Sequence, residues 1–231
     1  MSPRSTPRFR SSIPARARAR VVSRYPSGTP QRVEYFVGRS IVGHRHYDAD
    51  GELECDWGVR RGKRHGRAYR LDIPGKLLSA TAYRNGLEHG VARQWSDEGR
   101  LIGWYRMRNG TGIDLWWNET WTKPRRPYLA EVHFMRRGRR HGFEWWLNED
   151  QRSVYQERHW VDDEAHGIER EWNHRTRLRP GFPKFYVSGK RVSRKAYERE
   201  RNRDPSLPPY RIEDNQPWRR FPAIIVRRLA R

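Results

Sequence analysis

Histidines are the residues of this chain whose type and spacing could support chemistry. Four of them stand immediately before a glycine, at intervals of 24 residues or more: His65, His89, His141 and His166. Imidazole acts as a general acid or base near neutral pH and is the commonest metal ligand in proteins. Both uses need a partner group nearby, and no second histidine or carboxylate accompanies the four at ligand spacing. We therefore predict that they are turn residues, each packing on or bonding to its own hairpin.

A second group of potential metal ligands lies in GHRHYDADG (43–51), at His44, His46, Asp48 and Asp50. Imidazole and carboxylate suit several divalent metals, but a polar strand face that leads into a turn explains the same letters, and we favour that interpretation. The single cysteine, Cys55, is expected to pack within a strand, since no base partner is evident. The sequence contains no glycine-rich phosphate loop and no nucleophile motif. We expect no enzymatic activity, no cofactor, no metal site and no small-molecule substrate.

The His-Gly pairs belong to an internal repeat. YRNGLEHGVARQW (83–95) and VRRGKRHGRAYRL (59–71) share one frame, in which a turn glycine recurs every 24 to 28 residues. Repeats of this length are diagnostic of modular architectures. The predicted turn residues are Gly62, Gly66, Gly86, His89, Gly90, Gly110, Gly138, His141, Gly142, His166 and Gly167.

Apolar residues inside each repeat are separated by even numbers of positions, which is typical of extended strands and not of helices. The predicted strand pairs are 67–72 with 77–84, 91–96 with 100–108, 113–118 with 128–136, and 143–148 with 153–161. Short turns between consecutive strands favour pairing of neighbours. The sequence thus predicts an all-β fold, a single-layer antiparallel β-meander of about five to six hairpin repeats of about 24 residues, with a short C-terminal capping helix.

Four segments are expected along the chain. Residues 1–32 are rich in Arg, Ser and Pro and predict a disordered basic tail, which we favour over an organelle transit peptide. Residues 33–192 hold the repeats. Residues 193–203 predict the capping helix, with Ser193 as its N-cap. Residues 204–231 form a basic, Pro-containing tail that could dock on the sheet, bind a partner or touch an anionic membrane surface.

The pattern Y-x-N-G-x-x-x-H-G, followed by an aromatic strand, an acidic or Pro-Gly turn and then Leu, resembles the MORN-repeat variant over about residues 33–192. It is especially similar to bacterial proteins described as YwqK-type antitoxin components. The resemblance implies an elongated, twisted single-layer sheet that serves as a scaffold for proteins or lipids. This chain departs from the pattern at the insertion NETWTKPRRPY (118–128), in a degenerate fifth repeat, and in its basic flanks.

The net charge of +22 resides in the flanks of the sequence. Residues 1–33 carry 8 Arg and no acid, residues 175–231 carry 17 Lys or Arg against 5 acids, and residues 34–174 are nearly neutral. A protein partner is our main expectation, and nucleic-acid binding through the flanks is the alternative, because Arg neutralises phosphate. The longest apolar run, Ala223–Val226, is too short to span a membrane. The lone cysteine suits a reducing compartment, so we expect a cytoplasmic location.

Tryptophans separate into two sets by their positions in the repeat. Trp95, Trp117, Trp160 and Trp172 occupy positions that are apolar throughout, and we expect them on the packed face. Trp116 and Trp146 occupy positions that are polar in other repeats and should face the other way. With Trp121, Arg125 and Arg126 of the insertion they form a candidate partner-binding patch. The alternative is that the insertion folds back and covers the two rings.

Overall fold

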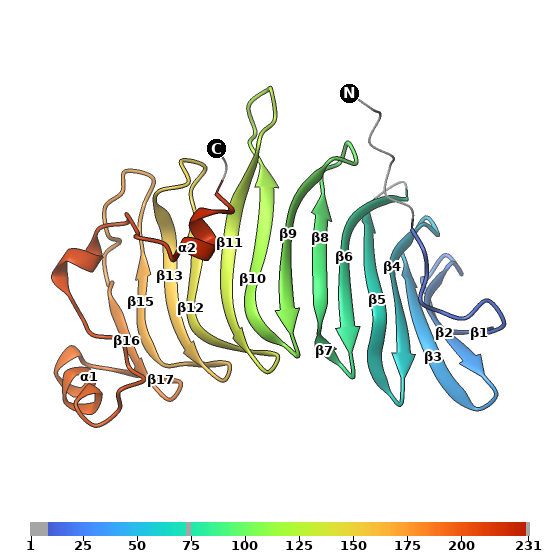
Figure 1. Cartoon of the computed structure of the whole chain (residues 1–231), viewed down its shortest axis with the longest axis horizontal. Helices are drawn as coiled ribbons and strands as arrows, with labels where there is room; N and C mark the ends of the chain where they lie inside the picture. The colour runs from blue at the N-terminus through green and yellow to red at the C-terminus, as the bar shows by residue number, and fades with distance from the viewer. Residues whose placement is uncertain (1–8, 73–74, 230–231) are drawn as a thin grey trace. The chain divides into compact units, whose positions relative to one another are not determined.

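The computed structural model describes residues 9–72 and 75–229, and the chain forms two compact units, Met1–Gly110 and Thr111–Arg231. In the described residues, seventeen strands follow one another in an antiparallel meander, with two short α-helices (Figure 1). The predicted all-β meander with a helix near the C-terminus is therefore confirmed.

Unit 1 contains nine strands in sequence order: β1 (Arg18–Arg24), β2 (Pro30–Val37), β3 (Ser40–Tyr47), β4 (Leu53–Arg60), β5 (Lys63–Asp72), β6 (Lys76–Arg84), β7 (Leu87–Glu88), β8 (Gly90–Trp95) and β9 (Leu101–Arg108). Each pairs antiparallel with its neighbour, and β6 pairs with both β7 and β8. The core of this unit is a cluster of Tyr69, Leu71, Leu77, Ala80 and Trp95.

Unit 2 contains the remaining strands: β10 (Thr111–Glu119), β11 (Pro127–Arg136), β12 (Arg139–Leu147), β13 (Val154–Val161), β14 (Glu164–Ala165), β15 (Gly167–Glu171), β16 (Lys184–Val187) and β17 (Lys190–Val192). The helix α1 (Arg194–Arg201), a 3-10 turn η1 (Ile212–Asn215) and α2 (Ala223–Val226) follow. All eight strands of the predicted pairs are present, with ends displaced by at most four residues.

A β-bulge recurs at one corner of the hairpin repeat and changes which residues share a face. In β12 and β13, Trp146 opposes Gln156 but the next residue, Leu147, opposes Val154, so one residue of β13 is left unpaired. The same shift separates Arg70 and Leu71 in β5. A bulge inserts one residue and reverses the alternation of side chains beyond it. Positions at even spacing across it therefore lie on opposite faces.

Trp160 is misplaced in our prediction for this reason. Counting from Gln156 by twos puts it on the face of Trp146, and its indole Nε1 donates to Glu144 on that same face at 2.7 Å. The other three tryptophans assigned to the packed positions, Trp95, Trp117 and Trp172, are buried.

Within residues 9–32, the N-terminal flank differs from the disordered tail that we expected over residues 1–32, whereas residues 1–8 lie outside the described residues. Residues 18–24 form β1, and residues 9–13 lie on the sheet: Ser11 Oγ donates to the buried carboxylate of Asp56 at 2.7 Å. A Cβ atom at Gly66 would clash with Ser12, so the absence of a side chain there leaves room for the segment. The N-terminal flank can pack on the sheet because glycine, which has no side chain, leaves space for it there.

The C-terminal flank also folds. Ser193 caps α1, accepting the Ala196 N–H at its hydroxyl at 3.2 Å, so the predicted N-cap is correct and the helix has eight residues. The following tail docks on the sheet of unit 2, where Pro217 O accepts the N–H of Val154 at 3.0 Å. Figure 1 draws α2 in front of β11 to β13. No helix in the described residues is long and apolar enough to cross a membrane.

Candidate partner-binding surface

The glycines predicted at turns hold backbone conformations that other residues adopt rarely. Gly62, Gly86, Gly110 and Gly138 lie in turns as predicted, whereas the other four lie in strands, so the turn prediction is wrong for Gly66, Gly90, Gly142 and Gly167. All eight have positive φ. At Gly86, φ is 87°, and a Cβ atom there would lie 3.6 Å from the nearest side-chain atom. Backbone strain and not crowding therefore selects glycine at this position.

The histidines of the His-Gly pairs link consecutive hairpins. The Nδ1 atom of His89 accepts the backbone N–H of Asn109 at 3.2 Å, and Nδ1 of His166 accepts that of Ser188 at 3.0 Å. His65 stands in the same relation to Asn85 at 3.5 Å. Each ring therefore bonds to the turn of the next hairpin, whereas we expected it to pack on or bond to its own hairpin. The His-Gly motif of the repeat is a joint between hairpins.

His141 is the exception among the four. Its Nδ1 lies 3.3 Å from a carboxylate oxygen of Asp162, which also pairs with Arg136. A carboxylate thus replaces the backbone N–H as the partner of this ring.

Of the four residues weighed as metal ligands, the two histidines pack on an aromatic ring, and Asp48 accepts the backbone N–H groups of Asp50 and Glu52. His44 stacks on Trp57 with ring centroids 5.4 Å apart, and His46 contacts the same indole edge-on at 4.9 Å. Burial lowers the pKa of both histidines and raises the pKa of the Cys55 thiol. In the part of the chain that the structure describes, no group of three or more His, Cys, Asp or Glu side chains could hold a metal ion.

Trp116 and Trp146 share one face of unit 2, opposite the face on which the C-terminal tail docks. Both oppose Glu131, one from β10 and one from β12, so the order across the three strands is Trp, Glu, Trp. Each ring is half-buried. The Arg158 guanidinium lies 5.6 Å from the centroid of the Trp146 ring. We call this set, Trp116, Glu131, Trp146 and Arg158, the tryptophan face.

A charged cluster adjoins the tryptophan face. His133 Nδ1 lies 3.6 Å from Asp114, and its Nε2 lies 3.3 Å from Glu131 and 3.5 Å from Glu144. Burial disfavours the imidazolium, but the hydrogen bonds to Asp114 and Glu131 and the negative charges of Asp114 and Glu144 outweigh it, and together they raise the pKa of His133 to about 9. His133 is therefore a cation at neutral pH that holds three carboxylates beside the tryptophans.

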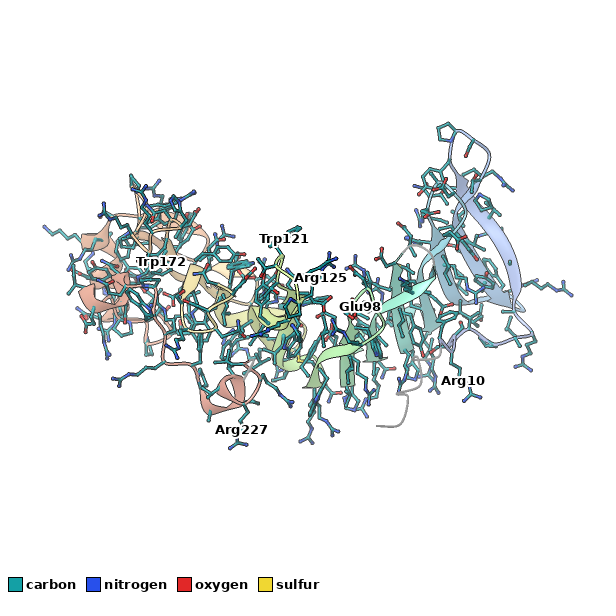
Figure 2. All side chains as sticks on the ribbon, turned by 90° about the horizontal axis from the view of Figure 1, so that it is seen from above. Arg10, Glu98, Trp121, Arg125, Trp172 and Arg227 are labelled. Carbon is teal, nitrogen blue, oxygen red and sulfur yellow. The ribbon has the colours of Figure 1, made fainter. Side chains whose placement is uncertain are left out.

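The insertion does not cover the two rings. Thr120 and Arg126 close it on itself through two hydrogen bonds of 3.0 Å, and residues 121–126 are all exposed. Trp121 is 91% exposed, so it shields neither Trp116 nor Trp146. Figure 2 shows Trp121 and Arg125 at the outer end of this loop, which joins β10 to β11 in Figure 1. These exposures favour the interpretation that the insertion contributes to a partner-binding patch. They give little support to the alternative that it folds back over Trp116 and Trp146.

Sequence reasoning missed a buried ionic joint beneath the C-terminal tail. Glu157, 3% exposed, accepts from Arg170 and Arg219 at 2.7 Å each and from the indole of Trp145 at 2.7 Å. Burial opposes the charge, but the two guanidinium groups prevail and keep the pKa of Glu157 below its ordinary value. The repeat offers no signal for this joint, because Arg219 lies outside it.

A cleft of about 360 Å³ opens beside the tryptophan face, lined in part by Arg158, Trp160, Glu169, Lys184 and Tyr186. Glu169 neutralises Arg158 at 3.0 Å, and Lys184 stacks on Phe182.

No protein-family model matches the chain, and no curated protein is similar to it.

Proposed function

We propose that this protein is a non-enzymatic β-repeat scaffold that binds a partner protein, through the insertion loop and the tryptophan face of unit 2. The observation that carries the proposal is the exposure of Trp121, 91%, on a loop that also bears Lys123, Arg125 and Arg126. A tryptophan supplies a large contact area with few degrees of freedom, and Trp and Arg dominate the binding energy of protein interfaces. The partner surface that fits this loop is acidic with an apolar pocket.

The tryptophan face extends this contact. Trp116 and Trp146 are half-buried, so part of each ring remains available beside the charged cluster of His133. The resemblance to antitoxin components supports a partner that is a toxin encoded nearby, and co-expression of neighbouring reading frames with this chain is the direct way to look for it.

The experiment that tests the proposal is affinity capture with three variants. Trp121→Ala removes the exposed ring, and Trp116→Ser with Trp146→Ser removes the face. Trp218→Ala serves as the matched control, because Trp218 is a 54% exposed tryptophan on the C-terminal tail. We expect one protein to be retained by wild type and by the control, and to be lost with Trp121→Ala at unchanged melting temperature. Retention by every variant would refute the proposed surface.

Nucleic-acid binding through the flanks has less support. Ser11 binds Asp56 and Arg219 binds Glu157, so the described parts of both flanks are folded onto sheets around these residues. If the function were of this kind, deleting residues 204–231 would remove a salt-sensitive affinity for DNA or RNA that the Trp121→Ala variant retains.

A further inference from the structure

The first strand of unit 1 offers an edge for pairing. β1 pairs with β2 within this unit, and six of its seven residues are exposed. In an antiparallel pair, alternate residues direct their N–H and C=O groups away from the partner strand. β1 therefore presents a row of backbone donors and acceptors along its outer side, as an edge strand does.

Helix α1 covers the last hairpin of unit 2, formed by β16 and β17. The strand β1 of unit 1 has no such cover in the part of the chain that the structure describes. Tyr197 of α1 is fully buried against Phe185 of β16, with ring centroids 5.1 Å apart, and Val192 of β17 packs on the same cluster. Folded proteins usually protect an edge strand in this manner. Among the described residues of unit 1, no helix packs on β1.

The side chains of β1 define what a pairing strand would contain. Arg18 and Arg20 point to one face, and Ala19 and Val21 to the other, because side chains alternate along a strand. Arg18 and Arg24 have no carboxylate partner among the described residues, and Arg20 remains 67% exposed although it pairs with Glu34. The edge thus combines exposed positive charge with exposed small apolar groups.

The strand β2, which pairs with β1, already has side chains that complement those of β1. β2 places Glu34 opposite Arg20, at 2.9 Å, and Val33 opposite Val21. A strand that paired with the outer side would meet the same two faces, since directly opposite residues share a face of the sheet. Alternating acidic and apolar residues would satisfy both.

We propose that β1 binds an extended, acidic segment of a partner protein, which adds a strand to the sheet of unit 1. Backbone hydrogen bonds supply the affinity, and acidic residues opposite Arg18 and Arg20 set the register. A second copy of this chain fits poorly, because an antiparallel pair of β1 strands would bring arginines close to arginines, and like charges directly opposite repel. This inference concerns unit 1 and does not depend on the surface proposed on unit 2.

The test uses a fluorescein-labelled peptide, acetyl-Ser-Val-Glu-Val-Glu-Val-Ser-amide, and fluorescence anisotropy with the full chain. The wild type should bind it, and Arg18→Glu with Arg20→Glu should weaken binding by at least about tenfold, since two ion pairs become repulsive contacts. The control Arg199→Glu with Arg211→Glu changes the net charge equally on unit 2 and should leave binding unchanged.

One further probe examines the pairing without altering the protein. A peptide of the same sequence with N-methyl groups on alternate residues keeps its charges but loses backbone donors, so its binding should disappear. Equal binding of the N-methylated peptide would overturn the proposal, as would equal loss with the control variant.

Two other ligands of β1, a nucleic acid and a second copy of this chain, would give different results. Tighter binding of a single-stranded dT decamer at the same arginines, or a dimer in sedimentation that the Arg18→Glu, Arg20→Glu variant abolishes, would also overturn it. Trp121→Ala should leave peptide binding intact, so failure here is distinguishable from failure of the proposed function.

Discussion

The stability of unit 2 should fall as pH rises from about 6.5 to 9.5, because of one buried imidazole. The pKa of His133 is raised to about 9, against an ordinary value of 6.5. A group whose pKa is higher in the folded state stabilises that state fully below its unfolded pKa, and loses the contribution as pH rises through the folded value. The imidazolium must lose its proton while Asp114, Glu131 and Glu144 stay negative around it.

The magnitude follows from the shift. About 2.5 pH units correspond to roughly 3 kcal/mol of unfolding free energy. The side chain of His133 is 15% exposed and that of Glu131 39%, so solvent screens part of this interaction. We therefore expect an observed loss of about 1–3 kcal/mol between pH 6.5 and 9.5.

Urea denaturation at a series of pH values measures this loss, with His133→Gln as the control. The glutamine variant is neutral throughout and should show a flat profile over the same window, after a lower stability at pH 6.5. NMR titration of the His133 ring gives the pKa directly, with the variant supplying the assignment among the nine histidines. A ring that titrates near 6.5, or an equal pH dependence in the variant, would refute the reasoning.

Three mutations test the joints of the fold by thermal or urea unfolding. Gly86→Val should cost about 1–3 kcal/mol from the positive φ alone, whereas Gly86→Asn should cost much less; equal losses would contradict the strain argument. His89→Ala should cost about 1 kcal/mol by removing the acceptor for the N–H of Asn109, and His89→Asn should recover part of it if its carboxamide oxygen replaces Nδ1. Glu157→Ala should cost about 3–5 kcal/mol, because it removes the carboxylate that pairs with buried Arg170 and half-buried Arg219, and a change below about 1 kcal/mol would show that the joint with Arg219 is not structural.

Turns, strands and the helix N-cap could be predicted from the sequence, because each depends on residues that are close together in the chain. A turn glycine, an alternation of apolar residues and the N-cap Ser193 each lie within a few residues of the structure that they specify. The long-range contacts were not accessible. Ser11 meets Asp56 and Arg219 meets Glu157 across 45 and 62 positions, and no periodicity records such a meeting.

The assignment of faces failed at one place for a physical reason. Counting by twos is reliable only while a strand stays regular, and the bulge before Gln156 shifts every later residue of β13 to the other face. Trp160 was misplaced by this shift. Trp116 and Trp146 were correctly placed opposite Trp117 and Leu147, because the residue left unpaired at each register shift belongs to the partner strand, β11 or β13, and the alternation along β10 and β12 is kept.

We expect partner binding and stability to depend on different parts of the chain. The positions that recur, such as Gly86 and His89, form the joints between hairpins, where a positive φ or a histidine acceptor is needed in most repeats. A position needed for every joint cannot also single out one partner. Specific recognition must come from places where the repeat is broken. In this chain these are the insertion that carries Trp121 and the arginine-rich strand β1, which precedes the first repeat. Both places remain exposed, whereas the C-terminal tail is docked on the sheet through Arg219. We therefore propose that partner binding occurs at these two places.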